Sequence, residues 1–250
     1  MGREVTAALQ LSGLRKSFGG LPATDDVSLD VMAGERRLII GPNGAGKTTL
    51  FNLITGDLRP DAGAIRLFGE EVSRLKAHER AHRGLARTYQ IITLFPKDSL
   101  EHNVVLSLLG LLKSRWDALR PLASQAGLYE EARRILGLVG LEERAALPIA
   151  QVSYGEKRRV EIAMALAQRP RLLLLDEPLA GLSPEERSGI KVLIQGIPPD
   201  VTVVMIEHDM DTALDLAERV TVLHYGKVIV EGTRGEVVAD PRTREVYLGT

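Results

Sequence analysis

The sequence predicts an α/β fold in which a helical segment is inserted into a core built on a parallel sheet. Two runs, 172–175 and 201–206, are apolar except for Thr202, as in strands that are buried on both faces of a parallel sheet. A glycine-rich loop separates a β-branched run from a helical pattern at 41–48. Residues 101–168 carry a helical, strand-free pattern, so we expect an α-helical subdomain there.

Composition limits the classes of function. The chain has 250 residues, a net charge of −1 and no cysteine. This length suits one large domain or two small ones. The near-zero charge gives no general attraction to nucleic acid, so no nucleic-acid partner is expected. Without cysteine there is no disulfide framework or thiolate metal site. The apolar runs are too short to cross a bilayer and no signal-peptide core is evident, so we expect a membrane role only through a partner.

Local patterns place the remaining elements. We expect strands at 7–11, 27–31, 37–40, 64–68, 85–89, 171–177 and 201–206, and a hairpin from 219–223 and 227–231. Helices are expected at 47–55, 101–112, 128–139 and 156–168, after Ser183, and over 235–248 with a break at Pro241. Trp116 lies in the least regular part of the helical segment, where a packing role is expected.

The glycine-rich loop has the composition of a phosphate-binding loop. Glycines let several backbone amides point at one anion, and the helix that follows adds its positive end. Lys47 adds a charge over the outer phosphates, the Thr48 hydroxyl can ligate Mg²⁺, and Thr49 is within reach of an inner phosphate. The alternative is a chance glycine-rich turn before a helix. The predicted loop comprises Gly41, Pro42, Asn43, Gly44, Ala45, Gly46, Lys47 and Thr48.

Two polar groups follow the apolar strands. Asp176 and Glu177 end the strand at 171–177, and ligands of α/β proteins bind at such strand ends. Asp176 can hold Mg²⁺, and Glu177 can polarise an attacking water as general base. His208 follows the strand at 201–206 and can hydrogen-bond a γ-phosphate. Taken singly, the acidic pair could be a surface feature and the histidine structural.

Other candidate features have simpler alternatives. Phe18 lies in a predicted glycine-bounded turn, 16–20, where its ring could stack on a base or fold onto the core. His78 and His82 share a helical face within the basic stretch 76–83, but no third metal ligand is evident, so a solvated face is expected.

The segment around Ser153 is explained by helix capping, except for one pair. Ser153 and Glu156 have capping-box spacing. The intervening Tyr154-Gly155 pair is left without a role. The basic run 157–159 that follows is expected to be a solvated face.

Together these residues resemble an ABC-type ATPase subunit over essentially the whole chain. The phosphate loop, Gln90, Ser153-Tyr154-Gly155, Asp176-Glu177 and His208 occur in that family's order and approximate spacing. The match is most similar to ATP-binding subunits of branched-chain amino acid importers, although urea-type importers look alike. The similarity to importers of branched-chain amino acids rests on Tyr154 and on three stretches, 87–90, 180–183 and 247–249.

The resemblance implies a fold and an assembly. It implies a P-loop NTPase (RecA-like) core with an antiparallel β subdomain and an inserted α-helical subdomain. Residues 1–250 would form a single ABC ATPase domain, with the core at 1–90 and 170–250 and the helical subdomain at 91–169. Two subunits, identical or different, would close head to tail around two MgATP. They would be bound to permease subunits at the cytoplasmic face of the inner membrane.

The resemblance also implies roles for individual residues. Phe18 would stack on adenine, and Gly41 to Thr49 would hold the phosphates. Gln90 would touch Mg²⁺ or the water and report to the membrane partner. Ser153 and Gly155 would contact the γ-phosphate of a nucleotide that the other subunit holds. The apolar stretch 91–96 is the candidate permease-docking surface.

The chain departs from the family pattern at three positions. Tyr154 replaces a usual glycine, Glu156 replaces glutamine, and Ser183 stands where aspartate is common. None of these changes removes a catalytic group, but the last bears on signalling across the dimer.

Three alternatives remain. A soluble ABC ATPase without transport usually has two cassettes or a coiled-coil insertion, and this chain has neither. A GTPase would need an Asn-Lys-x-Asp motif, which is absent, and a kinase would give Ser153 no purpose. Glu177 and His208 argue against a nonhydrolytic binding module.

Overall fold

The computed structural model describes residues 7–112, 125–208 and 213–248. Trp116 and Gly249 therefore lie outside the described residues. The chain divides into two compact units. The first unit comprises Met1–Arg87, Arg171–Pro178 and Ile197–Thr250, and the second comprises Thr88–Pro170 and Leu179–Gly196.

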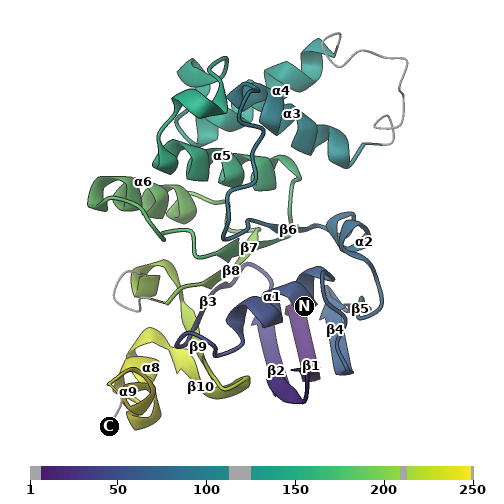
Figure 1. The fold of residues 1–250 in the computed structure, drawn as a ribbon, viewed down its shortest axis with the longest axis vertical. Coiled ribbons are helices and arrows are strands. Elements are labelled where there is room, and N and C mark those ends of the chain that lie inside the picture. The colour runs from purple at the N-terminus through teal and green to yellow at the C-terminus, as the bar shows by residue number, and fades with distance from the viewer. Residues whose placement is uncertain (1–6, 113–124, 209–212, 249–250) are drawn as a thin grey trace, which may run out of the picture. The chain divides into compact units, whose positions relative to one another are not determined.

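The first unit is built on two sheets (Figure 1). The antiparallel sheet has the order β2 (Leu21–Met32), β1 (Ala7–Phe18), β4 (Ala62–Leu67) and β5 (Glu70–Glu71). The larger sheet has the order β10 (Lys227–Thr233), β9 (Arg219–His224), β3 (Arg36–Ile40), β8 (Thr202–Ile206), β7 (Leu172–Asp176) and β6 (Leu85–Arg87). Strands β9 to β6 run parallel, and β10 pairs antiparallel with β9.

Helix α1 (Lys47–Thr55) packs into the core that the two sheets share. Its Leu50, Phe51, Leu53 and Ile54 are fully buried together with residues from both sheets. Among its described residues this unit also contains the helices α2 (Ala77–Ala81), η5 (Leu214–Leu216), α8 (Arg234–Ala239) and α9 (Pro241–Leu248). The break predicted at Pro241 is confirmed, because α9 begins there.

The second unit is helical within its described residues. Its elements are α3 (Leu100–Gly110), α4 (Ala126–Leu138), η3 (Glu142–Arg144), η4 (Ile149–Gln151), α5 (Tyr154–Ala167) and α6 (Pro184–Gln195). Helices α3, α4 and α5 enclose a separate apolar core (Figure 1). The predicted absence of strands from 101–168 is confirmed for the part of that range the structure describes.

Several predicted boundaries are wrong. Strands β1 and β2 are each 12 residues long, so Lys16 and Phe18 continue a strand and only Gly19-Gly20 forms the turn. The register shifts between Leu11 and Leu14 on β1, and this bulge hides the alternation that marks a strand. Strand β6 ends at Arg87 rather than at residue 89.

Two predicted solvated faces contain buried arginines. Arg80 is fully buried and donates to the carbonyls of Leu53, Ile54, Ser73 and Leu75. Arg158 is also fully buried and pairs with Glu161 at 2.8 Å. The prediction fails at these positions because each guanidinium finds backbone acceptors that lie far away in the chain, Leu53 and Ile54 for Arg80 and Tyr89 for Arg158.

No helix within the described residues is both long and apolar enough to cross a membrane.

Candidate functional site

The phosphate loop connects β3 to α1 and requires glycine at two positions. A Cβ on Gly41 would lie 2.2 Å from the Leu223 carbonyl oxygen. A Cβ on Gly46, whose φ is 98°, would lie 2.2 Å from the carbonyl oxygen of Ala23. The loop is therefore pressed against β2 and β9, and only glycine allows so close an approach.

Lys47 is the first residue of α1 and is almost fully buried. Its Nζ donates to the carbonyl oxygens of Gly41 at 2.7 Å and Pro42 at 3.1 Å, so the ammonium is held over its own loop. Burial lowers the pKa of Lys47, while Glu177, Asp176 and Glu207 oppose this by favouring the charged form. The structure thus brings Lys47 into electrostatic interaction with three carboxylates.

These carboxylates lie at the carboxyl ends of neighbouring strands. Asp176 is the last residue of β7, and Glu177 follows it with a φ of 47°. The Glu177 amide donates to the Ile206 carbonyl at 3.0 Å, which ties the end of β7 to the end of β8. A left-handed conformation is uncommon for a residue with a side chain and often marks a functional position.

The end of β8 adds Glu207 and His208. Glu207 is buried, and its amide donates to Ile39 on β3 at 3.3 Å. His208 is exposed, with its Nδ1 3.9 Å from a Glu207 carboxylate oxygen. Sequence reasoning assigns no role to Glu207, although its place directly after a buried strand matches that of Glu177.

Arg87 is a second residue that sequence reasoning missed. Its guanidinium donates to Asp176 Oδ2 at 2.7 Å and to Asn52 Oδ1 at 2.6 Å. It also lies 3.4 Å from Asp57 and above the Phe51 ring. Arg87 therefore links the carboxylate at the end of β7 to the second half of α1. The only signal in the sequence is a basic residue within the predicted strand at 85–89.

Phe18 ends β1 with 48% of its surface exposed. The Lys16 ammonium lies 5.6 Å from the centre of its ring. The alternative of a ring folded onto the core is wrong, and an exposed ring stays available for stacking.

The segment that contains Gln90 belongs to the second unit. Arg158 donates to the carbonyls of Tyr89 at 2.9 Å and Gln90 at 3.4 Å, so α5 holds the backbone of this segment. Burial raises the pKa of Glu161, and its ion pair with Arg158 opposes that shift. Ile91 is 80% exposed and Phe95 is 55% exposed. The approach of Gln90 to the phosphate loop and the docking role of 91–96 stay predictions.

Ser153 begins α5 as predicted. Its hydroxyl accepts from the Glu156 amide at 3.2 Å, and its own amide donates to Glu156 at 2.8 Å, so the capping box is confirmed. The Gly155 amide is in the same first turn, where the positive end of the helix dipole favours an anion. Contact between this turn and a nucleotide on another subunit stays a prediction.

No group of three or more histidine, cysteine or acidic residues within the described residues could hold a metal ion. Among the described residues, no third side chain therefore joins His78 and His82 to form a metal site. A Mg²⁺ that is coordinated by substrate phosphates needs only one or two protein carboxylates as further ligands. Asp176 fits that requirement, since its buried oxygens lie in the environment of Lys47.

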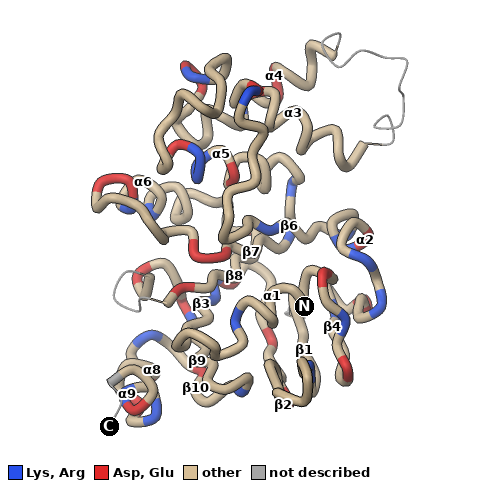
Figure 2. The backbone as a smooth tube through the Cα atoms, viewed as in Figure 1, with Lys and Arg blue, Asp and Glu red and all other residues tan. Residues whose placement is uncertain are grey.

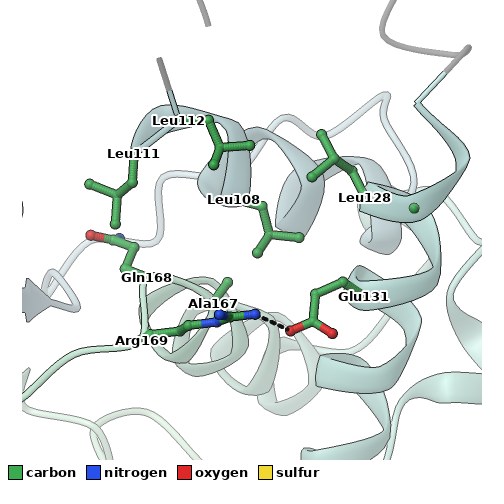
Figure 3. Close-up of a pocket in the computed structure, with 9 residues that line it drawn as sticks. Leu108, Leu111, Leu112, Leu128, Glu131, Ala167, Gln168 and Arg169 are labelled. Atoms are coloured by element: carbon green, nitrogen blue, oxygen red, sulfur yellow. Dashed lines mark hydrogen bonds and ion pairs between the residues drawn. The ribbon is translucent and has the colours of Figure 1, made fainter. Parts of the chain in front are cut away.

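A pocket of about 400 Å³ in the second unit has a different chemistry (Figure 3). Four of its nine lining residues are leucines, and a Glu131–Arg169 ion pair of 3.4 Å crosses one side. None of the residues predicted to bind nucleotide lines it, so it is not part of the candidate site. The leucines are Leu108, Leu111, Leu112 and Leu128.

A phosphate loop and paired carboxylates at the carboxyl edge of a parallel sheet define a nucleotide-hydrolysing protein of the P-loop class. Within that class the chain belongs to the ABC transporter family, whose family model matches residues 24–180.

Two relatives illustrate the range of the likeness. The high-affinity branched-chain amino acid transport ATP-binding protein BraF of Pseudomonas aeruginosa is 38% identical over 252 residues, covering 96% of this chain and 97% of its own. The lipopolysaccharide export system ATP-binding protein LptB of Acidithiobacillus ferridurans is 38% identical over 242 residues, covering 96% of each chain.

Two solved structures share the fold. The ADP conformation of MJ1267, an ATP-binding cassette of an ABC transporter, has a TM-score of 0.87 at 30% identity and covers 98% of this chain and 99% of its own. The cassette MJ0796 has a TM-score of 0.78 at 27% identity over 90% of this chain and 98% of its own. That structure is a dimer in a post-hydrolysis state with bound ADP and phosphate. The prediction of an ABC ATPase fold is confirmed.

Proposed function

We propose that this chain hydrolyses MgATP to power the import of branched-chain amino acids through permease subunits at the cytoplasmic face of the inner membrane. The observation that carries the ATPase part is the electrostatic interaction of Lys47 with Asp176 and Glu177 at the carboxyl end of β7. The amino acid part rests on similarity to BraF along nearly the whole chain.

The phosphate loop binds the triphosphate with its amides and the Lys47 ammonium. Phe18 stacks on the adenine, and Thr49 reaches an inner phosphate. Asp176, Thr48 and Gln90 would hold Mg²⁺, which would neutralise charge on the phosphates. Arg87 fixes one oxygen of Asp176, and this contact orients the carboxylate toward the loop.

Hydrolysis is an in-line displacement. A water oxygen attacks the γ-phosphorus while the bond to the β,γ-bridging oxygen breaks, which releases ADP and inorganic phosphate. Glu177 accepts the proton of the attacking water. His208 hydrogen-bonds a γ-phosphate oxygen, and Lys47 stabilises the charge on the equatorial oxygens.

The working assembly is a dimer of cassettes arranged head to tail. Ser153 and Gly155 of one subunit contact the γ-phosphate held by the other, so each site is complete only after closure. The similar cassette MJ0796 is dimeric after hydrolysis, which supports a dimer of cassettes. The surface at 91–96 docks the permease.

The decisive experiment replaces the proposed base. We expect Glu177→Gln to bind ATP as tightly as wild type but to hydrolyse it about 10²–10⁴-fold more slowly. Glu185→Gln makes the same charge change on an exposed residue of α6 and should retain the wild-type rate. A wild-type rate for Glu177→Gln contradicts the assignment of the base.

A second candidate function is lipid export, because LptB is as similar as BraF in identity. Co-purification of the membrane partner, followed by ATPase assays in proteoliposomes, separates the two. Stimulation by leucine with its binding protein supports import, whereas stimulation by lipopolysaccharide alone supports export.

A further inference from the structure

A carboxylate from the same chain occupies the first turn of α5. Glu186, on α6, accepts from the Ser153 hydroxyl at 3.2 Å and from the Gly155 amide at 3.1 Å through one oxygen, Oε1. Both donors are those proposed above for the partner's γ-phosphate. All three residues belong to the second unit.

This contact goes beyond the cap of α6. The Glu186 Oε2 atom accepts from the Ser183 amide at 3.1 Å, which completes the capping box of α6. Capping alone would leave Oε1 to solvent. Instead, Oε1 reaches donors that are more than thirty residues away, so one carboxylate bridges the positive ends of two helices. Figure 2 shows the acidic start of α6, while the start of α5 carries acidic Glu156 followed by the basic run 157–159.

The fit is close on the α5 side. A Cβ on Gly155 would lie 2.5 Å from Glu186 Oε1, so any larger residue here would require the Glu186 carboxylate to shift. The pKa of Glu186 lies below its usual range, first because the Ser183 amide donates to it, and then through Gly155, Ser153 and the Arg159 charge. At neutral pH the turn therefore already holds an anionic oxygen.

A carboxylate oxygen and a phosphate oxygen compete for the same donors. The Ser153 hydroxyl has a single hydrogen, and so does the Gly155 amide. Two anions at this distance would also repel each other strongly in a closed, dehydrated interface. The γ-phosphate can therefore enter only after Glu186 has left.

We propose that Glu186 is a built-in competitor for the partner's γ-phosphate, which holds the Ser153–Gly155 anion site until ATP displaces it. This inference rests on the proposed function, because the displaced contact belongs to the proposed dimer. Glu186 thereby sets the ATP concentration at which two subunits close, while nucleotide binding to the phosphate loop of the single chain is unaffected.

The size of the effect follows from occupancy. An apparent dissociation constant equals the intrinsic one divided by the fraction of sites that are free. If Glu186 occupies the donors about nine-tenths of the time, the ATP concentration for half-maximal dimerisation rises about tenfold. Its removal should lower that concentration by the same factor.

The test measures ATP-driven dimerisation by analytical ultracentrifugation in Glu177→Gln protein, in which ATP persists. Glu186→Gln removes the charge and Glu186→Ala removes the side chain, and each is added to that parent. We expect both to reach half-maximal dimerisation at an ATP concentration about 3–10-fold lower than the parent. Glu185→Gln is the matched control, because Glu185 accepts from the Ser183 hydroxyl, at 3.0 Å, and not from Ser153 or Gly155, so it should leave the midpoint unchanged.

Each result bears on a separate claim. The competitor role is wrong if the Glu186 variants are folded, as shown by their unfolding temperatures, and need the same or a higher ATP concentration for half-maximal dimerisation than the parent. In that case Glu186 only links α5 to α6. If the parent binds ATP but stays monomeric at every concentration, the head-to-tail assembly is wrong, and the competitor role is overturned with it.

Discussion

Replacing Arg80 with methionine tests how α1 is held behind the phosphate loop. The Arg80 guanidinium donates to the carbonyls of Leu53 at 2.6 Å and Ile54 at 2.7 Å, in the last turn of α1. It also donates to Leu75 and Ser73 at 3.0 and 3.2 Å. Burial lowers its pKa to about 10, so it remains charged at neutral pH.

Methionine keeps the apolar stem but leaves these four carbonyls without the guanidinium. Each buried carbonyl that loses its donor costs about 1–3 kcal/mol, and relief from burying a charge offsets part of the sum. We therefore expect Arg80→Met to lower the free energy of unfolding by about 3–5 kcal/mol, which is what remains of the carbonyl losses after that offset. For a chain of this length that is roughly a 10 °C fall in Tm.

The assay is urea and thermal unfolding followed by circular dichroism, with hydrogen exchange of the α1 amides. Arg83→Met is the matched control, since Arg83 pairs with Glu70 at 2.7 Å on the surface. That exposed pair should contribute less than about 1 kcal/mol. Equal losses for the two variants, or a loss below about 1 kcal/mol for Arg80→Met, would refute this reasoning.

Three further predictions concern the loop, the acidic strand end and pH. Gly46→Ala should abolish ATP binding, measured by calorimetry, because its Cβ has no room beside β2; retained affinity would contradict that geometry. Arg87→Met should raise the Mg²⁺ concentration needed for half-maximal hydrolysis more than Arg87→Lys does, because Asp176 loses the contact that orients it. Equal effects of the two substitutions would exclude the orienting role. The pKa of Glu131 is lowered to about 2, first by its hydrogen bond to Arg134. Its stabilising effect is therefore present above about pH 4.5 and lost as pH falls toward 2, so the stability gap between wild type and Glu131→Gln should shrink from pH 6 to pH 3; a constant gap would contradict it.

The sheet and the phosphate loop could be predicted because their signals are local. Buried parallel strands appear as continuous apolar runs, and the loop needs glycine at set positions. The capping boxes at Ser153 and Ser183 could be predicted equally well, since each involves two residues that are three positions apart. These patterns depend on neighbours in the chain and not on the assembled fold.

Contacts between distant segments could not be predicted in the same way. Arg80 reaches carbonyls 26 and 27 residues away, and Arg158 reaches carbonyls 68 and 69 residues away. Every residue has a backbone carbonyl, so the residue types in the sequence do not indicate which carbonyls accept these hydrogen bonds. The same holds for Glu186, whose capping role is visible while its contact with Ser153 and Gly155 is not.

The most direct measurement of the central claim is a structure of the Glu177→Gln protein with ATP and Mg²⁺. We predict two copies in which the γ-phosphate lies on Lys47 of one subunit and touches Ser153 and Gly155 of the other. The substituted side chain at position 177 and the His208 ring should lie beside that phosphate. A terminal phosphate bound away from Lys47, or one that no group of the second subunit reaches, would contradict the account.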